Sequence, residues 1–360
     1  MCAVWYLDPS QAVAAYRALV ALPAAPRPRY AVKANAHPAL LAALAAAGAH
    51  FAVVGEAELA ALRVLGVPGA RIACVTPGPP ATLLRACRAA GVGWYAVDSP
   101  WEVRKLGALV PGAAALVVLA LPPAGRLRYP TVRIGAGLAD LDALLAAARA
   151  APVELIGVQL HVGSQCERLA AWRRGVVLAA LAWQRLCTAG WRPRVLNLGG
   201  GLPVSYRRPV PTPAAIARAI ERAVARVFPV PPAELWWEPG RYIAAGAGVL
   251  AATVTRCEEG PRVVVQLDVG RYRGLPEAAR GIRYAYLADG TGTPRPTVVA
   301  GPLGPRYDLL ARRAWLPRLR AGERVWLPLA GAYTIVQTAY PATADVPVVL
   351  GPLPPLPAAR

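Results

Sequence analysis

From about residue 30 the chain alternates short apolar runs with longer stretches in which apolar residues recur three and four positions apart. Short apolar runs are typical of buried strands, and the longer spacing is typical of helices. The strand-like runs are Tyr30–Lys33, Phe51–Val54, Arg71–Val75, Gly93–Val97, Ala115–Leu119, Leu155–His161, Arg194–Leu198 and Leu235–Glu238. The helical stretches include Pro38–Ala47, Glu56–Leu65, Pro80–Ala90 and Ala214–Val227. About eight strand–helix repeats predict parallel strands in an α/β fold, a TIM-like (β/α)8 barrel.

The pattern changes after about residue 247, where short β-type segments are separated by Gly and Pro and not by long helices. These segments are Leu250–Arg256, Arg262–Leu267, Thr297–Ala300, Arg324–Leu327 and Val346–Leu350. They predict a mostly antiparallel C-terminal β domain, to which Ala3–Leu7 adds a strand. We therefore expect a barrel domain over 26–246 and a β domain over 247–360 joined by residues 1–10.

Composition limits the classes of protein that remain. Hydrophobic residues make up 56% of the 360, but 33 Gly and 38 Pro interrupt them, and no run approaches the roughly 18 apolar residues of a membrane span. The first residues show no basic region followed by an apolar one, so we expect no secretory signal and a cytoplasmic protein.

Cysteine spacing and charge exclude further classes. The six cysteines form no C-x-x-C pair, so we predict neither a metal site nor thioredoxin-like chemistry. The net charge of +20 has two interpretations, a surface for an acidic partner or a compositional bias toward arginine. The arginines are scattered and no aromatic-interleaved basic tract occurs, so we predict no nucleic-acid binding.

Polar and glycine residues gather where the predicted barrel strands end, which is where TIM-type barrels carry their functional groups. They are Lys33, Glu58, His161, Gly199, Gly200, Gly201 and Glu238. Lys33 is unusual, because only two of the 40 Lys and Arg residues are lysines, Lys33 and Lys105. An amine can form a Schiff base with a carbonyl, and a guanidinium cannot. A triple glycine suits close approach of backbone to a phosphate, so the two features together suggest pyridoxal 5'-phosphate (PLP).

Five motifs, Y-A-V-K-A-N, H-V-G-S, L-G-G-G, E-P-G-R and G-A-Y-T, occur here in the same order as in a known family. With them the chain resembles the fold-type III PLP-dependent decarboxylases, the ornithine/diaminopimelate/arginine decarboxylase family, over about residues 28 to 350. The resemblance implies the barrel of the alanine racemases, PLP as cofactor, a small amino-acid substrate and a homodimer whose β domains contribute to the active sites.

The resemblance also implies residue roles. Lys33 would form the internal aldimine with PLP, and His161 would stack on the ring and join Lys33 as a catalytic residue. Glu238 would pair with the pyridinium nitrogen, which favours decarboxylation over the racemisation of relatives that place an arginine there. The remaining cofactor-binding residues implied are Ser164, Gly199, Gly200, Gly201, Gly240, Arg241 and Tyr333.

One family signature, G-P-x-C-[DE]-x-x-D, is altered to G-P-L-G-P-R-Y-D over Gly301–Asp308. Gly304 stands at the position of the cysteine that helps to reprotonate the α-carbon, and Pro305 at that of an acid that holds the substrate's distal amine. We therefore predict an altered substrate, not simple ornithine or lysine, with Asp268, Arg306 and Asp308 as candidate contacts. An anionic substrate, or one carried on an acidic protein, is compatible with Arg306 and the net charge.

Three functions stay open on these residues. The first is decarboxylation of an amino acid or amino-acid conjugate in polyamine or specialised biosynthesis. The proton would be supplied by His161, Lys33 or water. The second is other carbanion chemistry, namely epimerisation or decarboxylation-dependent transamination. The third is a non-catalytic regulatory protein that has kept the barrel of a decarboxylase.

Overall fold

The computed structural model describes residues 2–122, 124–125, 134–289, 291–334 and 346–357. The chain divides into two compact units. The barrel unit comprises residues 14–203 and 210–240, and the β unit comprises residues 1–13, 204–209 and 241–360. The sequence placed the domain boundary after 246, whereas the contacts divide the chain after Gly240.

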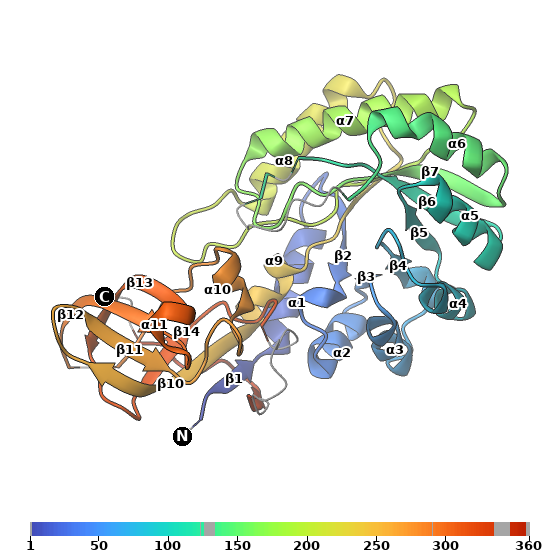
Figure 1. The fold of residues 1–360 in the computed structure, drawn as a ribbon. Coiled ribbons are helices and arrows are strands. Elements are labelled where there is room, and N and C mark those ends of the chain that lie inside the picture. Colours follow the sequence, from blue (N-terminus) through green and yellow to red (C-terminus); the bar gives the residue numbers. More distant parts are fainter. Residues whose placement is uncertain (1, 123, 126–133, 290, 335–345, 358–360) are drawn as a thin grey trace. The chain divides into compact units, whose positions relative to one another are not determined.

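Eight parallel strands close into the barrel in chain order, and β9 pairs back to β2 (Figure 1). They are β2 (Arg27–Ala31), β3 (His50–Val53), β4 (Ile72–Cys74), β5 (Trp94–Val97), β6 (Ala113–Val118), β7 (Val153–Gln159), β8 (Val195–Asn197) and β9 (Glu234–Trp237). The predicted (β/α)8 barrel is confirmed. Its strands are mostly apolar because the helices cover their outer faces and side chains such as Ile156 and Trp236 fill the interior.

Helices alternate with these strands and lie around the barrel (Figure 1). They are α2 (Pro38–Ala46), α3 (Glu56–Val64), α4 (Ala81–Ala89), α5 (Pro100–Leu109), α6 (Leu141–Arg149), α7 (Leu169–Thr188) and α8 (Pro213–Val227). Several begin with a proline after a capping side chain. Ser99 accepts from the N–H of Glu102 before α5, and Thr212 accepts from the N–H of Ala215 before α8. The remaining helix at this end of the sequence is α1 (Pro9–Val20), which spans the boundary between the units.

The β unit is a mixed sheet in the order β13-β12-β11-β10-β1-β15, with β14 paired to β10. Its strands are β1 (Val4–Leu7), β10 (Gly248–Glu258), β11 (Val263–Leu267), β12 (Thr291–Ala300), β13 (Leu309–Arg318), β14 (Arg324–Leu327) and β15 (Val348–Leu350). Two pairings, β11 with β12 and β1 with β15, are parallel, and the others are antiparallel. The predicted mostly antiparallel domain with an N-terminal strand is confirmed. The sequence analysis missed β13, in which the adjacent Arg312 and Arg313 interrupt the apolar pattern.

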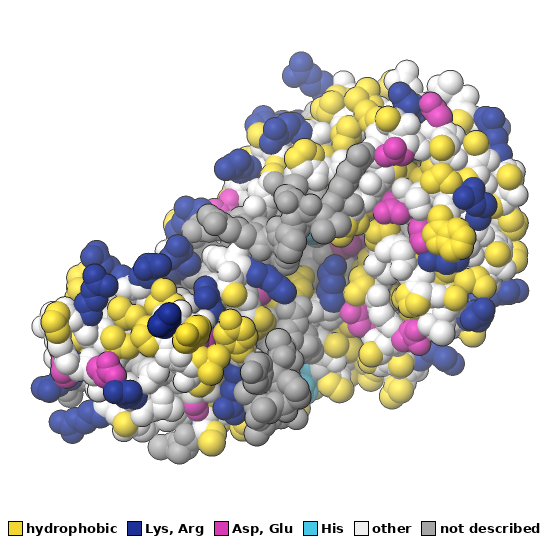
Figure 2. Space-filling model, viewed as in Figure 1, with side chains coloured by type: hydrophobic (Ala, Val, Ile, Leu, Met, Phe, Trp, Pro, Cys, Tyr) yellow, Lys and Arg dark blue, Asp and Glu magenta, His cyan; other side chains and the backbone are white. Residues whose placement is uncertain are grey.

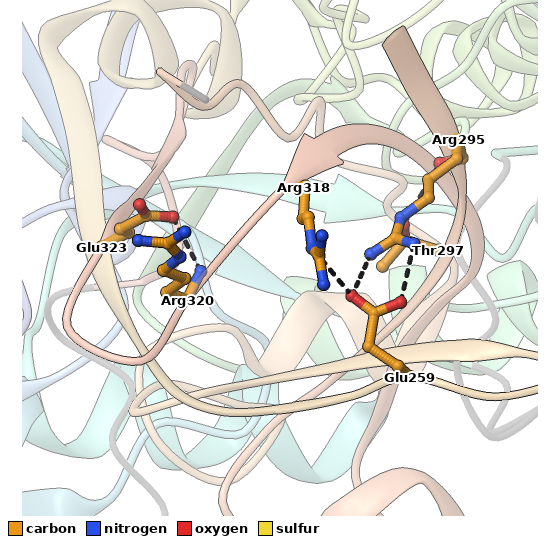
Figure 3. Close-up of polar contacts among 6 residues, drawn as sticks. All are labelled: Glu259, Arg295, Thr297, Arg318, Arg320 and Glu323. Atoms are coloured by element: carbon orange, nitrogen blue, oxygen red, sulfur yellow. Dashed lines mark hydrogen bonds and ion pairs between the residues drawn. The ribbon is translucent and has the colours of Figure 1, made fainter. Parts of the chain in front are cut away.

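Ion pairs join strand ends on the surface of the β unit (Figure 3). Glu259, just after β10, accepts two hydrogen bonds from the Arg295 guanidinium of β12 and lies 3.5 Å from Nε of Arg318 in β13. Both arginines lower the pKa of Glu259, Arg295 most strongly. Because Glu259 and Arg318 are exposed and Arg295 is partly exposed, these pairs contribute little to the stability of the fold.

The arginines responsible for the net charge lie largely on the surface, where dark blue side chains are spread among yellow ones (Figure 2). Within the described residues, no helix combines the length and the apolar character needed to cross a membrane.

Candidate active site

Lys33 lies in a single 3-10 turn, η1 (Val32–Ala34), directly after β2. The sequence placed it at the end of a strand, but the strand ends at Ala31 because the backbone turns there. Val32 and Ala34 are fully buried, whereas the side chain of Lys33 is exposed. The apolar neighbours therefore anchor the turn and direct the one amine of this segment out of the core.

The charge of Lys33 acts on three other polar groups of the barrel unit. It lowers the pKa values of Glu58, His161 and Glu238, although burial is the largest influence on each of them. Glu58 is fixed at the start of α3, where its Oε2 accepts from the N–H of Val54 at 2.8 Å. The structure thus brings Lys33, His161 and Glu238 into one electrostatic group.

Glu238 belongs to a buried hydrogen-bonded chain that crosses the ends of three strands. Asn197 at the end of β8 donates from Nδ2 to Oε1 of Glu238 at 2.6 Å and lies 3.3 Å from Oε1 of Gln159 at the end of β7. Gln159 in turn donates to the carbonyl of Val75 at 3.0 Å. Burial raises the pKa of Glu238, while the hydrogen bond from Asn197 and the charges of Lys33 and Arg29 oppose that rise. The network holds a carboxylate in a fixed orientation inside the barrel.

Asn197 and Gln159 were missed by the sequence analysis. Both are polar residues at the ends of otherwise apolar strands, and this was the signal that could have identified them.

The triple glycine forms a tight loop between β8 and the backbone of neighbouring strands. Gly199 and Gly201 have φ values of 62° and 113°, which favour glycine. A Cβ added at Gly200 would lie 2.8 Å from the carbonyl oxygen of Glu238, and one at Gly201 would lie 2.6 Å from the carbonyl oxygen of Gly163. The loop therefore needs three glycines for close backbone packing, which leaves a surface of backbone without side chains.

His161 lies two residues beyond the end of β7, not at its last position as predicted. Its Nδ1 accepts from the N–H of Gly200 at 3.2 Å, which fixes the ring beside the glycine loop. The residue is exposed, but desolvation of the ring by the surrounding protein and, secondarily, the charge of Lys33 lower its pKa to about 4. The imidazole is therefore neutral at physiological pH.

Ser164 follows Gly163 in the loop that packs against Gly201. The next residue, Gln165, is buried and has a φ of 56°, a left-handed conformation that is uncommon for a residue with a side chain. Such outliers persist where the surrounding structure enforces them, often at binding sites.

Arg241 and Tyr333 come together within the β unit. Arg241, in α9 (Arg241–Ala244) just after Gly240, is buried, and its guanidinium lies 4.9 Å from the ring centre of Tyr333. It also donates to the hydroxyl of Tyr206 at 3.0 Å and forms a two-point ion pair with Glu277, which is 0% exposed. These oxygen partners outweigh desolvation and raise the pKa of Arg241. Tyr333 has a left-handed φ of 57°, a further enforced conformation.

The three candidate substrate residues of the β unit are Asp268, Asp308 and Arg306. Both carboxylates already have hydrogen-bond partners. Asp268 accepts from the N–H groups of Ala3 at 2.6 Å and Thr253 at 2.8 Å. Asp308 is 1% exposed and accepts from the N–H of Arg271 at 2.7 Å. Arg306 is exposed, with its guanidinium 5.5 Å from the ring centre of Tyr307. Both acids therefore accept hydrogen bonds from backbone N–H groups of other segments of the β unit.

The barrel unit fits PLP by the chemistry of its groups. It offers an exposed amine, a buried carboxylate in a fixed orientation, a neutral imidazole and a glycine loop into which no Cβ fits. An aldehyde, a ring nitrogen and a phosphate have matching partners in this set. Among the described residues, no group of three or more His, Cys, Asp and Glu side chains could hold a metal ion.

Comparison with known proteins agrees with a PLP-binding barrel unit. Residues 11–245 match the family model of the pyridoxal-binding domain of pyridoxal-dependent decarboxylases. The lysine/ornithine decarboxylase of Selenomonas ruminantium is 31% identical over 70% of this chain and 65% of its own length. Antizyme inhibitor 2 of Mus musculus is 27% identical over 73% of this chain and 61% of its own length. The chain thus spans about 65% or less of the length of these curated relatives.

A solved structure shares the fold over nearly the whole chain. The lysine decarboxylase from Selenomonas ruminantium is 30% identical, covers 97% of this chain and 92% of its own, and superposes with a TM-score of 0.85.

Proposed function

The chain belongs to the family of pyridoxal-dependent decarboxylases, and on that premise we propose that it removes the α-carboxyl group of an amino acid or amino-acid conjugate. PLP is the cofactor that this family membership brings. The observation that carries the proposal is the grouping of Lys33, His161 and buried Glu238 beside the glycine loop.

PLP, when bound, supplies an electron-withdrawing ring that stabilises the negative charge left on the α-carbon after CO2 departs. The chain's own groups set that chemistry. Lys33 would hold the cofactor covalently through Nζ. Glu238, oriented by Asn197, would hold a proton at the ring nitrogen, and the backbone N–H groups of Gly200 and Gly201 with Ser164 would bind phosphate. Arg241 and Tyr333 of the β unit, together with Gly199 and Gly240, stay in the predicted binding set.

The residues support Lys33 over His161 as the source of the proton that replaces CO2. The N–H of Gly200 donates to Nδ1 of His161, and the pKa of this imidazole is lowered to about 4, so it carries no proton in excess at neutral pH. Lys33 belongs to the same electrostatic group as His161 and has an exposed side chain. We assign the proton to Lys33 or to water that it orders, because Gly304 offers no thiol.

The substrate we propose differs from simple ornithine or lysine. Recognition of a terminal ammonium needs a carboxylate that is free to pair with it, and Asp268 and Asp308 already accept from backbone N–H groups. An anionic or carrier-linked amino acid, with Arg306 as a contact, stays the alternative that the net charge suggests. A homodimer in the cytoplasm also stays a prediction.

The first test is spectroscopic. Purified protein with PLP should show a Schiff-base absorbance band that borohydride abolishes, Lys33→Arg should lack it, and Lys105→Arg should keep it. CO2 release would then be measured with ornithine, lysine, diaminopimelate and their N-acylated forms. No band with added PLP would contradict the proposal.

One comparison favours a second candidate, because relatives named antizyme inhibitor 2 also match this chain. A Schiff-base band without CO2 release or product from any amino acid would support a regulatory protein. Aldehyde product would instead indicate decarboxylation-dependent transamination, and deuterium uptake with the carboxylate retained would indicate epimerisation.

A further inference from the structure

Helices α7 and α8 pack against each other on the outside of the barrel and leave an open groove between them. The groove has a volume of about 650 Å³. It is lined by Leu169, Arg173 and Val177 of α7 and by Ala215, Arg218, Ala219, Arg222, Ala223, Arg226 and Val227 of α8. All of these residues belong to the barrel unit. Dark blue and yellow side chains lie beside one another over this part of the molecule (Figure 2).

The arginines of the groove form a regular row. Arg218, Arg222 and Arg226 are four residues apart and therefore lie along one face of α8, over about 12 Å of helix. Arg173 faces them from α7. All four are exposed, and within the described residues none makes a hydrogen bond or an ion pair. Like charges at this spacing repel by about 0.2–0.5 kcal/mol per pair, so the row is unfavourable to the helix by itself.

The floor of the groove is apolar. Val177 is 46% exposed although it is a large hydrophobic residue, and Ala219, Ala223 and Val227 form the adjacent surface of α8. The single acid of α8, Glu221, is not part of this lining but borders a separate cavity. The groove therefore combines an apolar floor, exposed at Val177, with unpaired positive charge along its edge.

We propose that this groove docks an acidic amphipathic helix of a partner protein. Apolar side chains of that helix cover the floor beside Val177, and Asp or Glu side chains four residues apart pair with Arg218, Arg222 and Arg226. A general arginine bias accounts for the number of arginines but not for their alignment along an apolar groove. Nucleic acid would use the charge and leave the apolar floor exposed, so the groove fits a protein helix better.

The test uses a fluorescein-labelled 18-residue helical peptide with leucines on one face and glutamates four residues apart beside them. Fluorescence anisotropy would follow its binding to the full-length protein. Reversing charge in Arg218→Glu/Arg222→Glu should weaken binding by about tenfold, and Val177→Ser should weaken it about threefold. The matched control Arg312→Glu/Arg313→Glu makes the same charge change on β13 and should leave binding within about twofold. Circular dichroism would confirm that each variant is folded.

Two further probes separate this docking from attraction of any polyanion. One is a peptide of the same composition whose order removes the apolar face, and the other is a 20-base-pair DNA duplex. Preference for the amphipathic peptide, lost in the α8 variant, supports the proposal. Equal binding of all three probes, equal loss in the two charge-reversal variants, or no peptide binding would overturn it.

Discussion

Asn197 donates a 2.6 Å hydrogen bond to Glu238, and both side chains are buried where β8 and β9 end. A buried carboxylate that loses such a partner bears the full cost of desolvation. Asn197→Ala should therefore lower the free energy of unfolding by about 1–3 kcal/mol and weaken PLP binding, because Glu238 becomes harder to ionise. Urea unfolding and a PLP titration by absorbance would measure both effects. Ser205→Ala, which removes only an exposed hydrogen bond to the carbonyl of Arg208, is the control, and equal effects in the two variants would contradict the assignment.

Lys33 should be visible in the titration of His161. Its positive charge disfavours the imidazolium, so Lys33→Gln should raise the pKa of His161 above its present value of about 4. Nuclear magnetic resonance of the histidine ring carbons would measure this shift, with the three histidines assigned by substitution. Lys105 pairs with Glu102 on α5 at 2.8 Å, and Lys105→Gln should leave the pKa of His161 unchanged. An unchanged value in Lys33→Gln would mean that the two groups are not coupled.

His50 should make the fold sensitive to acid. Burial and, secondarily, the charges of Arg29 and Arg71 lower its pKa from 6.5 to about 4. Between these values the unfolded chain binds more protons than the folded one, so stability is lost as the pH falls from 6.5 toward 4. His50→Gln should reduce this loss by on the order of 1 kcal/mol after solvent screening. Urea unfolding at pH 8 and pH 5 measures the difference, and a pH dependence equal to the parent's would refute the role of His50.

Substitution of Gly304 should be destabilising although there is space for a Cβ at this position. Its φ is 75°, so Gly304→Ala should destabilise the protein by about 1 kcal/mol. The nearest atom to an added Cβ would be Nε2 of Gln266 at 3.3 Å, so backbone strain and not crowding is the main cost. Gly246, exposed and with open space around its Cβ position, gives the control Gly246→Ala. Similar unfolding free energies for both variants would show that the left-handed turn is not strained.

The ion pair of Arg241 and Glu277 should be costly to break. Glu277→Gln leaves a buried guanidinium with a neutral partner and should destabilise the protein by about 3 kcal/mol. Glu154→Gln removes an exposed pair with Arg194 and should cost less than about 1 kcal/mol. Chemical denaturation compares the two. A small loss in Glu277→Gln would mean that Arg241 does not depend on this carboxylate.

The sequence predicted the barrel well because most strands are short, largely apolar runs and the helices between them show apolar residues three and four positions apart. It also placed Lys33, His161, Gly199–Gly201 and Glu238 at one rim, since strand order in a barrel follows chain order. The predicted ends of the strands were less accurate. Lys33 reads as part of an apolar strand, but burial of Val32 and Ala34 requires a turn there, not an extended chain.

Partners that are distant in the sequence could not be predicted. Glu277 is 36 residues from Arg241, and nothing in its own segment marks it as an ion-pair partner. Asp308 matched a family position, but only the structure reveals that a Cβ at Gly270 or Gly301 would collide with its carboxylate. The roles assigned to the individual site residues stay predictions until the variants above are measured.

The β unit is assembled from three separate stretches of chain, which has a consequence for synthesis on the ribosome. β1 is made first, yet its neighbours β10 and β15 begin only at Gly248 and Val348. At about 5–20 residues per second, β15 emerges roughly 20–70 s after β1. The barrel strands are complete at Trp237, so the barrel can close while β1 still has both edges unpaired. Premature termination between Trp237 and Val348 would therefore release a chain with a finished barrel and an open sheet edge, which favours aggregation.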